Sequence, residues 1–329
     1  MARIALKIDV DTLRGTQEGV PRLQQLLGEC RTQATFLFSL GFDHTGWALK
    51  NIFRPGFFQK VSRTSVIEHY GLKTLSYGVL LPAPDIGVKA RSEMRSVEKS
   101  GHEVGIHTWD HRVWQDYVRE ASPEWTLRQM NLAWDRFGEI FQKTPQTHGA
   151  AGWQMNATAL AHLDTMQIKY SSDGRAPLNL VPYRVQLSGV QLSGVQLSGV
   201  QLSGVQLNGQ TCQHIQYPTT LPTLDELIGV DDMTSEDVIK HLLSLTANNP
   251  NDQVFTLHAE LEGQKFLPLF KQLLIGWMSQ GHELVTMQEL HLSWQKTGQL
   301  RHLVELPFTW GEIPNRSGEL MRMPDEYPI

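Results

Sequence analysis

The stretch RIALKIDVD, residues 3–11, alternates apolar and polar residues around β-branched positions and ends in two aspartates separated by Val10. This pattern is typical of a buried strand, and the closing aspartates indicate that the strand stops at a polar surface. We therefore predict a strand over residues 3–10, with Asp9 and Asp11 at its carboxyl end.

Strands and helices alternate along the rest of the chain. Apolar residues at helical spacing predict a helix over 18–30, and the apolar run ATFLFSL predicts a strand over 34–40. Further helices are predicted at 90–99, 126–141 and 267–280, and further strands at 101–107, 253–258 and 283–286. Repeated alternation of this kind indicates a mainly parallel sheet, either open or closed into a barrel.

The composition is that of one large globular α/β domain with additions. Of the 329 residues, 40% are hydrophobic and 19% are charged, which supplies ample material for a core. The net charge of −5 gives no overall attraction to nucleic acid. Cys30 and Cys212 stand far apart and predict free thiols. Charged residues interrupt the amino-terminal segment, so we expect no signal peptide and a cytoplasmic protein.

Two segments interrupt or extend the predicted domain, which we place at residues 1–295. Residues 185–209 hold five tandem pentapeptides, four reading VQLSG and the last VQLNG. A period of five fits neither a helix nor a strand, so this insertion is either a surface loop or a small β-ribbon or solenoid. Residues 296–329 are rich in proline and glycine and predict an irregular, partly docked extension.

Three predicted strands end in residues that bind metals or transfer protons. In parallel α/β folds the active site forms at the carboxyl ends of the strands. The first strand ends in Asp9 and Asp11, the GHEVGIH strand ends in His107 with His111 four residues later, and QVFTLH ends in His258. Taken singly, such residues are more often helix caps or structural histidines, so the inference rests on their conjunction.

The conjunction predicts a metal-dependent hydrolase. Residues four apart in a helical turn share one face, so His107 and His111 can chelate one cation. With Asp11 they form a facial set that suits Zn²⁺, Co²⁺, Mn²⁺ or Ni²⁺, which the sequence does not distinguish. Asp9 and Asp11 point the same way along the strand, so one is free to act as a base. His258 suits a general acid that faces them from the opposite wall.

These motifs resemble the polysaccharide deacetylases of carbohydrate esterase family 4, also called NodB-homology domains. The paired aspartates match the first family motif, which implies that Asp9 is the base and Asp11 a metal ligand. HTWDH matches the second motif and implies His107 and His111 as ligands, and Thr256-Leu257-His258 matches the last motif loosely and implies His258 as the acid. The resemblance implies a deformed (β/α) barrel.

The chain departs from the family pattern at two places. Val10 separates the aspartates, whereas many members have adjacent aspartates. The arginine-containing third motif is absent in its usual form, and residues 149–153 stand in its place. The family arginine orients the base, so the resemblance leaves the orientation of Asp9 open.

Further stretches resemble one branch of the family, whose members remove a formyl group from undecaprenyl-phosphate-linked 4-deoxy-4-formamido-L-arabinose during lipid A modification. These stretches are IDVDT (8–12), GHEVGIHTWDH (101–111), AAGW (150–153), YSSDGR (170–175), LPTLDELIG (221–229) and TLHAELEG (256–263). The branch implies formate release and a free amine, which adds positive charge to lipid A and weakens binding of cationic peptides such as polymyxin. Two alternatives are deacetylation of chitin-like or peptidoglycan sugars and a non-catalytic sugar- or lipid-binding protein.

Five residues are candidates for substrate binding. Guanidinium groups suit phosphate oxygens and sugar hydroxyls, which favours Arg14 and Arg175, although either could form an ordinary ion pair. Asp173 lies two residues before Arg175, and Glu260 could orient His258 or bind sugar. Trp153 could stack on a sugar face or belong to the core.

A lipid-linked substrate implies contact with the cytoplasmic face of the inner membrane. Residues 47–63, WALKNIFRPGFFQKVSR, interleave aromatic and basic residues and contain no acid. Such a segment fits an anionic headgroup layer. It fits equally a helix and loop whose apolar residues pack in the core.

Overall fold

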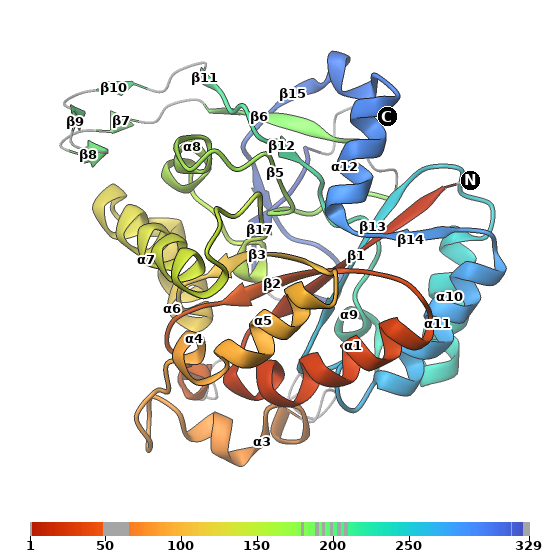
Figure 1. The fold of residues 1–329 in the computed structure, drawn as a ribbon. Coiled ribbons are helices and arrows are strands. Elements are labelled where there is room, and N and C mark those ends of the chain that lie inside the picture. Colours follow the sequence, from red (N-terminus) through yellow and green to blue (C-terminus); the bar gives the residue numbers. More distant parts are fainter. Residues whose placement is uncertain are drawn as a thin grey trace.

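The computed structural model describes residues 2–48, 66–178, 181–187, 210–316 and 318–324, together with four short backbone stretches between residues 191 and 206. Its central element is an eleven-stranded sheet with the strand order β11-β6-β12-β5-β4-β3-β2-β1-β13, in which β14 also pairs with β1 and β15 with β6 (Figure 1). The strands are β1 Arg3–Val10, β2 Thr35–Ser39, β3 Glu103–Thr108, β4 Thr147–His148, β5 Tyr170–Ser171, β6 Tyr183–Leu187, β11 Gln210–Thr211, β12 Ile215–Gln216, β13 Gln253–His258, β14 Glu283–Val285 and β15 Val304–Pro307.

The sheet is parallel wherever the sequence predicted it. β1 pairs in parallel with β2, β13 and β14, and β2 with β3, while antiparallel pairs occur where β6 meets β11 and β12. Within the described residues no strand pair joins β11 to β13, but Thr220 and Leu221 donate backbone hydrogen bonds to the Val254 carbonyl. This irregular segment thus connects the region after β12 to the far side of the sheet.

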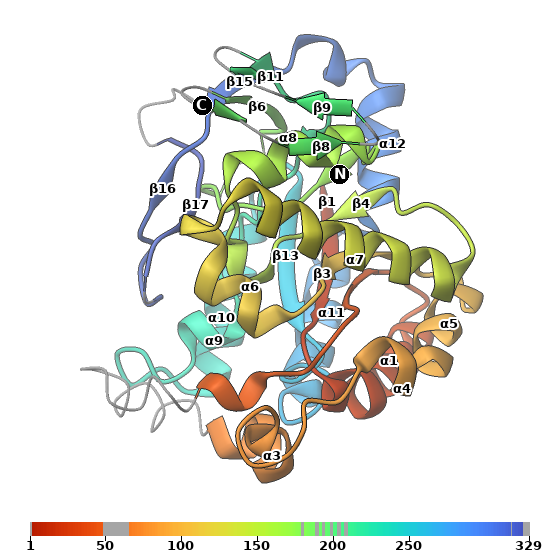
Figure 2. The same cartoon turned by 90° about the vertical axis from the view of Figure 1, so that its left-hand side faces the viewer.

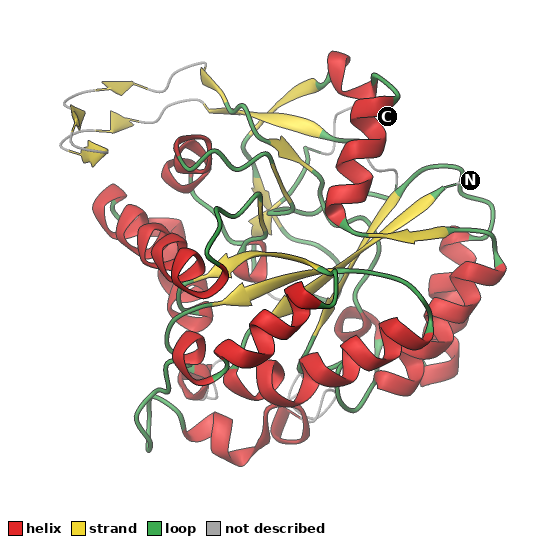
Figure 3. Ribbon diagram, in the orientation of Figure 1, coloured by secondary structure: helices red, strands yellow, loops and turns green. Residues whose placement is uncertain are grey.

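Helices cover the strands, and Figure 3 shows them mostly outside the sheet. Their bounds are α1 Val20–Glu29, α3 Val66–Ser76, α4 Ile86–Lys89, α5 Arg91–Lys99, α6 His111–Tyr117, α7 Pro123–Phe141, α8 Ala157–Thr165, α9 Leu224–Leu227, α10 Ser235–Thr246, α11 Leu267–Ser279 and α12 Met287–Lys296. The longest of them, α7, begins where the Ser122 side chain accepts from the Trp125 N–H and Pro123 fixes the first turn. It ends at Gln142, which adopts a left-handed conformation.

The apolar faces predicted from periodicity form the main core. On α1, Val20, Leu23, Leu26 and Leu27 are buried against β1 and β2, and the strands themselves contribute side chains such as Ile8 and Phe36. Each strand and helix predicted from the sequence occurs within a few residues of its expected bounds. The α/β class and the parallel sheet are confirmed.

The pentapeptide insertion contains short antiparallel strand pairs. β7 (Gln191–Leu192) pairs with β10 (Val205–Gln206), and β8 (Val195–Leu197) pairs with β9 (Val200–Leu202). Figure 1 shows them projecting beyond α8 from the edge formed by β6 and β11. Of the alternatives left open by the sequence, the structure has a β-ribbon.

The carboxyl-terminal segment adds strands and core residues. β15 pairs in parallel with β6, and β16 (Trp310–Gly311) pairs with β17 (Leu320–Met321) along one side of the molecule (Figure 2). Leu306, Met321 and Met323 are buried in a second hydrophobic cluster with residues of α8 and β6. The division of the chain at residue 295 stays a prediction.

A buried histidine on α8, the helix that contributes to the second cluster, is expected to make the fold sensitive to acid. His162 on α8 is buried, its Nε2 lies 2.8 Å from Asn131 Oδ1, and burial lowers its pKa from 6.5 to about 4. Below pH 6.5 the unfolded chain takes up a proton that the folded chain does not, so stability falls as the pH drops towards 4. We expect this residue to lower the free energy of unfolding by about 2 kcal/mol when the pH falls from 7 to 5.

Urea unfolding of the chelator-treated protein at both pH values measures the effect. His162→Gln should reduce the difference between the two pH values by about that amount, whereas His302→Gln, at an exposed position, should not. An unchanged difference in His162→Gln would contradict the assignment.

Candidate active site

The carboxyl end of β1 carries the acidic residues of the site. Lys7, Asp9 and Asp11 are buried and alternate along one side of the strand. Glu260 fixes the turn that follows, because its Oε1 accepts hydrogen bonds from the Asp11 N–H (3.1 Å), the Thr12 N–H (2.8 Å) and the Thr12 hydroxyl (2.8 Å). A Cβ at position 15 would lie 1.8 Å from Glu260 Oε1, so Gly15 is required for this approach.

The two histidines of the HTWDH motif come from a strand and a helix. His107 lies in β3, whereas His111 is the first residue of α6, whose N-terminus is capped by the Asp110 side chain. The expectation that both lie on one helical turn is therefore wrong. The strand-to-helix turn brings them together instead, with ring centroids 5.3 Å apart.

Asp11, His107 and His111 form one cluster. His107 Nε2 lies 3.2 Å from Asp11 Oδ1 and His111 Nε2 lies 3.3 Å from Asp11 Oδ2, and one ligand atom from each residue falls within 4.8 Å of the others. His107 Nδ1 lies 2.6 Å from the Gly149 carbonyl, to which it must donate. In the neutral ring this leaves a lone pair on Nε2, directed at a carboxylate oxygen.

This donor set fits a divalent cation. A lone pair that faces a carboxylate oxygen repels it unless a cation or proton lies between them. The Oδ1 atoms of Asp9 and Asp11 are buried and accept no hydrogen bond of ordinary geometry from the described residues. One carboxylate and two imidazole nitrogens match the ligands of catalytic zinc and similar metals.

The charges in the cluster favour the ligand forms of these side chains. Burial acts to raise the pKa of Asp11, but His111 and His107 outweigh it and hold that pKa well below its usual range. Burial lowers the pKa of His111 to about 4, so this imidazole is neutral at pH 7. A carboxylate and a neutral imidazole are the forms that bind metal.

His258 reaches the cluster from the side opposite His107. β13 lies on the other side of β1 from β3, and His258 is in register with Asp9. Burial acts to lower the pKa of His258, but the carboxylates of Asp11, Asp225, Glu262 and Asp9 raise it to about 9. Glu262 also accepts a 2.7 Å hydrogen bond from the His258 N–H. The ring therefore carries a proton at neutral pH, and a bound cation would offset part of this effect.

Of the residues predicted to bind substrate, Glu260 and Asp173 form hydrogen bonds with other parts of the protein. Glu260 holds the turn after β1, and burial together with the charge of Asp11 raises its pKa to about 8. Asp173 is fully buried, with Oδ1 2.6 Å from His148 Nδ1 and Oδ2 accepting from Gln216. The structure does not bring Asp173 into the group around Asp11.

The two arginines both have carboxylate partners. Arg14 Nε lies 3.1 Å from Glu18 Oε2, one helical turn away. Arg175 is buried, forms a two-pronged pair with Glu226 (2.9 and 3.0 Å), and lies 4.8 Å from the Trp153 ring centroid. Their predicted roles in substrate binding are not tested by these contacts.

Trp153 is a core residue surrounded by cations. It is 1% exposed, and its Nε1 donates to the Thr219 hydroxyl. Besides Arg175, the Lys7 ammonium and the Arg316 guanidinium lie 5.3 and 4.4 Å from its ring centroid. Burial leaves no ring face open to a sugar in this conformation, so the structure favours the core interpretation.

Arg175 also lines a pocket of about 410 Å³. Arg175, Glu226 and Arg322 line it together with apolar residues, including Pro222 from the loop before α9 and Ile313 from the carboxyl-terminal segment. Glu226 is next in sequence to Asp225, whose charge acts on His258. The volume of this pocket is large enough for a sugar unit.

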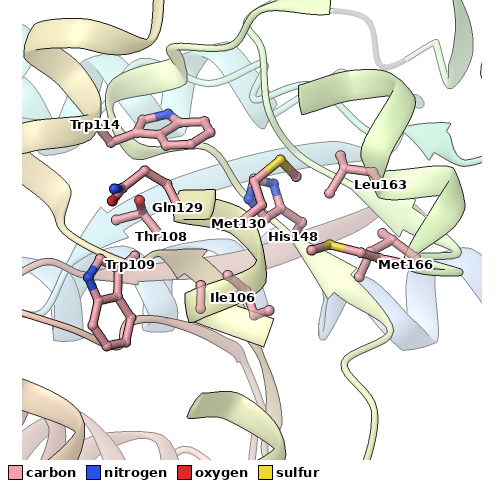
Figure 4. A pocket seen from close by; sticks show the side chains of 11 residues that line it. Ile106, Thr108, Trp109, Trp114, Gln129, Met130, His148, Leu163 and Met166 are labelled. Carbon is pink, nitrogen blue, oxygen red and sulfur yellow. The ribbon is translucent and has the colours of Figure 1, made fainter. Parts of the chain in front are cut away.

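A second, much smaller cavity lies between β3 and α7. Figure 4 shows its wall of mostly apolar side chains, including Ile106, Trp114 and Met130, with His148 among them. Its volume of about 10 Å³ holds no more than a single water. It cannot accept a sugar.

Of the predicted membrane segment 47–63, residues 49–63 lie outside the described residues. Trp47 is described, and its indole N–H donates to the Gly78 carbonyl at 2.9 Å. Among the helices that the structure describes, none has the length and apolar character needed to span a bilayer.

Three residues that contact or charge the site were not predicted from the sequence. Lys7 forms a 2.9 Å ion pair with Asp9 Oδ2, Glu262 binds the backbone of His258, and Asp225 adds to the charge around it. A lysine inside an otherwise apolar strand was an available signal for the first. The positions of Glu262 and Asp225 depend on loop geometry, which the spacing of apolar residues does not predict.

Comparison with known proteins agrees with this geometry. The polysaccharide deacetylase family model matches residues 4–171, which include β1, β3 and α6. A Shewanella sediminis protein named "Probable 4-deoxy-4-formamido-L-arabinose-phosphoundecaprenol deformylase ArnD" is 30% identical over 291 residues, covering 88% of this chain and 86% of that protein. The chain belongs to the polysaccharide deacetylase family.

Other matches extend this result. A Wigglesworthia glossinidia brevipalpis protein of the same name is 28% identical, with 84% of this chain and 88% of that protein covered. A Mycobacterium smegmatis crystal structure described as a polysaccharide deacetylase has a TM-score of 0.57 at 15% identity and covers 95% of each chain, which supports the fold. As a family member, the chain is a deacetylase- or deformylase-type hydrolase of an amide bond.

Proposed function

We propose that this polysaccharide deacetylase family member hydrolyses the N-formyl group of undecaprenyl-phosphate-linked 4-deoxy-4-formamido-L-arabinose, giving formate and the free 4-amino sugar. The observation that supports it most is the convergence of Asp11, His107 and His111 beside Asp9, whose Oδ1 accepts no hydrogen bond from the described residues. His258 completes the group, and the surrounding carboxylates raise its pKa. Formyl rather than acetyl as the group removed rests on the names of the relatives.

Asp11, His107 and His111 would hold a divalent metal, which when bound polarises the amide carbonyl and lowers the pKa of a water. Asp9 takes a proton from the attacking water while the water oxygen forms a bond to the formyl carbon and the C=O π pair moves onto the carbonyl oxygen. This pair forms the C=O bond again when the C–N bond breaks. His258 donates its proton to the nitrogen as the C–N bond breaks, so the sugar leaves as a neutral amine. The proton on Asp9 then passes to solvent, and His258 regains one.

The substrate has a sugar phosphate, which needs a binding pocket, and a lipid tail, which needs a membrane. We place the sugar and its phosphate in the 410 Å³ pocket, whose lining includes the guanidinium groups of Arg175 and Arg322. A substrate with a polyprenyl tail is met at a membrane surface, which we place at the cytoplasmic face of the inner membrane. The released amine would then serve lipid A modification and resistance to polymyxin.

Formate release from the lipid-linked formamido sugar tests the proposal. We expect stoichiometric release of formate by the metal-loaded enzyme, loss of release after chelation, and recovery on adding back Zn²⁺, Co²⁺, Mn²⁺ or Ni²⁺. The N-acetyl analogue of the same lipid is the matched control. Release of acetate from the analogue faster than release of formate from the formamido lipid would show that the enzyme is a deacetylase. Binding of the lipid without any hydrolysis would favour a non-catalytic protein.

A further inference from the structure

Lys7 is a charged side chain in the core of the molecule. It is 0% exposed and lies in β1 between the apolar residues Leu6 and Ile8. An unpaired ammonium in such a place costs several kcal/mol, so a buried lysine is retained only with a partner or a task. Its Nζ lies 2.9 Å from Asp9 Oδ2.

Gly149 and Trp153 pack around the ion pair between Lys7 and Asp9. A Cβ at position 149 would lie 2.7 Å from Lys7 Cε, so Gly149 leaves the room that the lysine occupies. The carbonyl of the same glycine accepts from His107 Nδ1, and the Trp153 ring covers the ammonium from 5.3 Å. Residues 149–153 thus enclose Lys7 where the arginine-containing motif of the family was expected.

The ion pair makes the two carboxylate oxygens of Asp9 different from each other. Oδ2 is occupied by the ammonium, whereas Oδ1 is buried and accepts no hydrogen bond from the described residues. Oδ1 lies 3.8 Å from His107 Nδ1 and so faces the histidine of the metal cluster. A carboxylate held in this way can present only one oxygen to a water beside the metal.

We propose that Lys7 is the positioning residue of the general base: its ammonium holds Asp9 Oδ2 and leaves Oδ1 directed at the reacting water. This inference rests on the proposed function, since it gives Asp9 the role of base. In this role the lysine acts only through the Asp9 carboxylate. The lysine and the base lie on the same strand, β1.

Two substitutions test the proposal. In Lys7→Met, a chain of similar length without charge, we expect kcat for formate release to fall by about 100-fold, with KM and bound metal within about twofold of the wild type. Lys7→Arg, which keeps a cationic donor, should recover part of kcat. The matched control is Lys271→Met, which breaks a surface ion pair with Glu29 and should leave kcat unchanged.

The outcomes separate positioning from simple stabilisation. A folded, metal-loaded Lys7→Met enzyme with wild-type kcat would overturn the proposal, and so would parallel loss of metal and kcat. If Lys7→Met does not fold, Lys7→Gln, which keeps a neutral donor, replaces it under the same criteria. Absence of formate release by the wild type would count against the proposed function, whereas equal release by wild type and variant would count against Lys7 alone.

Discussion

Replacing His107 by alanine is expected to remove both the metal and the activity. The substitution deletes one of three ligands and also frees the Gly149 carbonyl that fixes the ring. Two ligands remain, Asp11 and the partly exposed His111, and we expect two ligands to be too few to retain a catalytic cation. Since the metal supplies several kcal/mol of transition-state stabilisation, formate release should fall by about 1,000-fold or more.

Metal content measured by mass spectrometry, alongside formate release, checks this prediction. His302→Ala is the control, because His302 is exposed and outside the cluster. Stoichiometric metal in His107→Ala would show that the cluster is not the metal site.

Asp9→Asn is expected to stop turnover while leaving the metal in place. Asparagine has the same shape as aspartate but cannot take a proton, so we expect kcat to fall roughly 100- to 10,000-fold with stoichiometric metal retained. The change also deprives Lys7 of its anionic partner, so the free energy of unfolding should drop by about 3 kcal/mol.

Circular dichroism and urea unfolding establish that the Asp9→Asn variant is folded under the assay conditions, and metal analysis establishes occupancy. Asp252→Asn is a matched control, because it weakens an ion pair with Arg3 away from the cluster and should preserve kcat. A folded, metal-loaded Asp9→Asn enzyme with wild-type kcat would exclude Asp9 as the base.

The sequence predicted the parts of the fold that have long, regular patterns. The strand over 3–10 and the helix over 126–141 have enough apolar residues to show their period, and both occur as expected. β4, β5 and β12 have two residues each, too few for any period, and their places depend on pairing with neighbours far away in sequence. Such tertiary pairing is not encoded locally.

The candidate site divides in the same way. Spacing and strand ends led to Asp11, His107 and His111 because short local motifs carry them, although the helical reason given for the His107–His111 pair was wrong. Lys7 escaped notice because alternation along a strand assigns such a residue to a solvent face. Only the structure reveals that this side of β1 is covered by residues 149–153.

The β-ribbon of pentapeptides hangs from β6 and β11, and β4, β5 and β12 separate these strands from β3. Each repeat is a whole number of codons, so replication slippage would add or delete copies without disturbing the reading frame. Because the ribbon leaves from the sheet edge remote from β1, such length changes would lengthen or shorten a projection without moving the catalytic strands. A change in copy number at this position would therefore alter the projection and leave the candidate site on β1 and β3 in place.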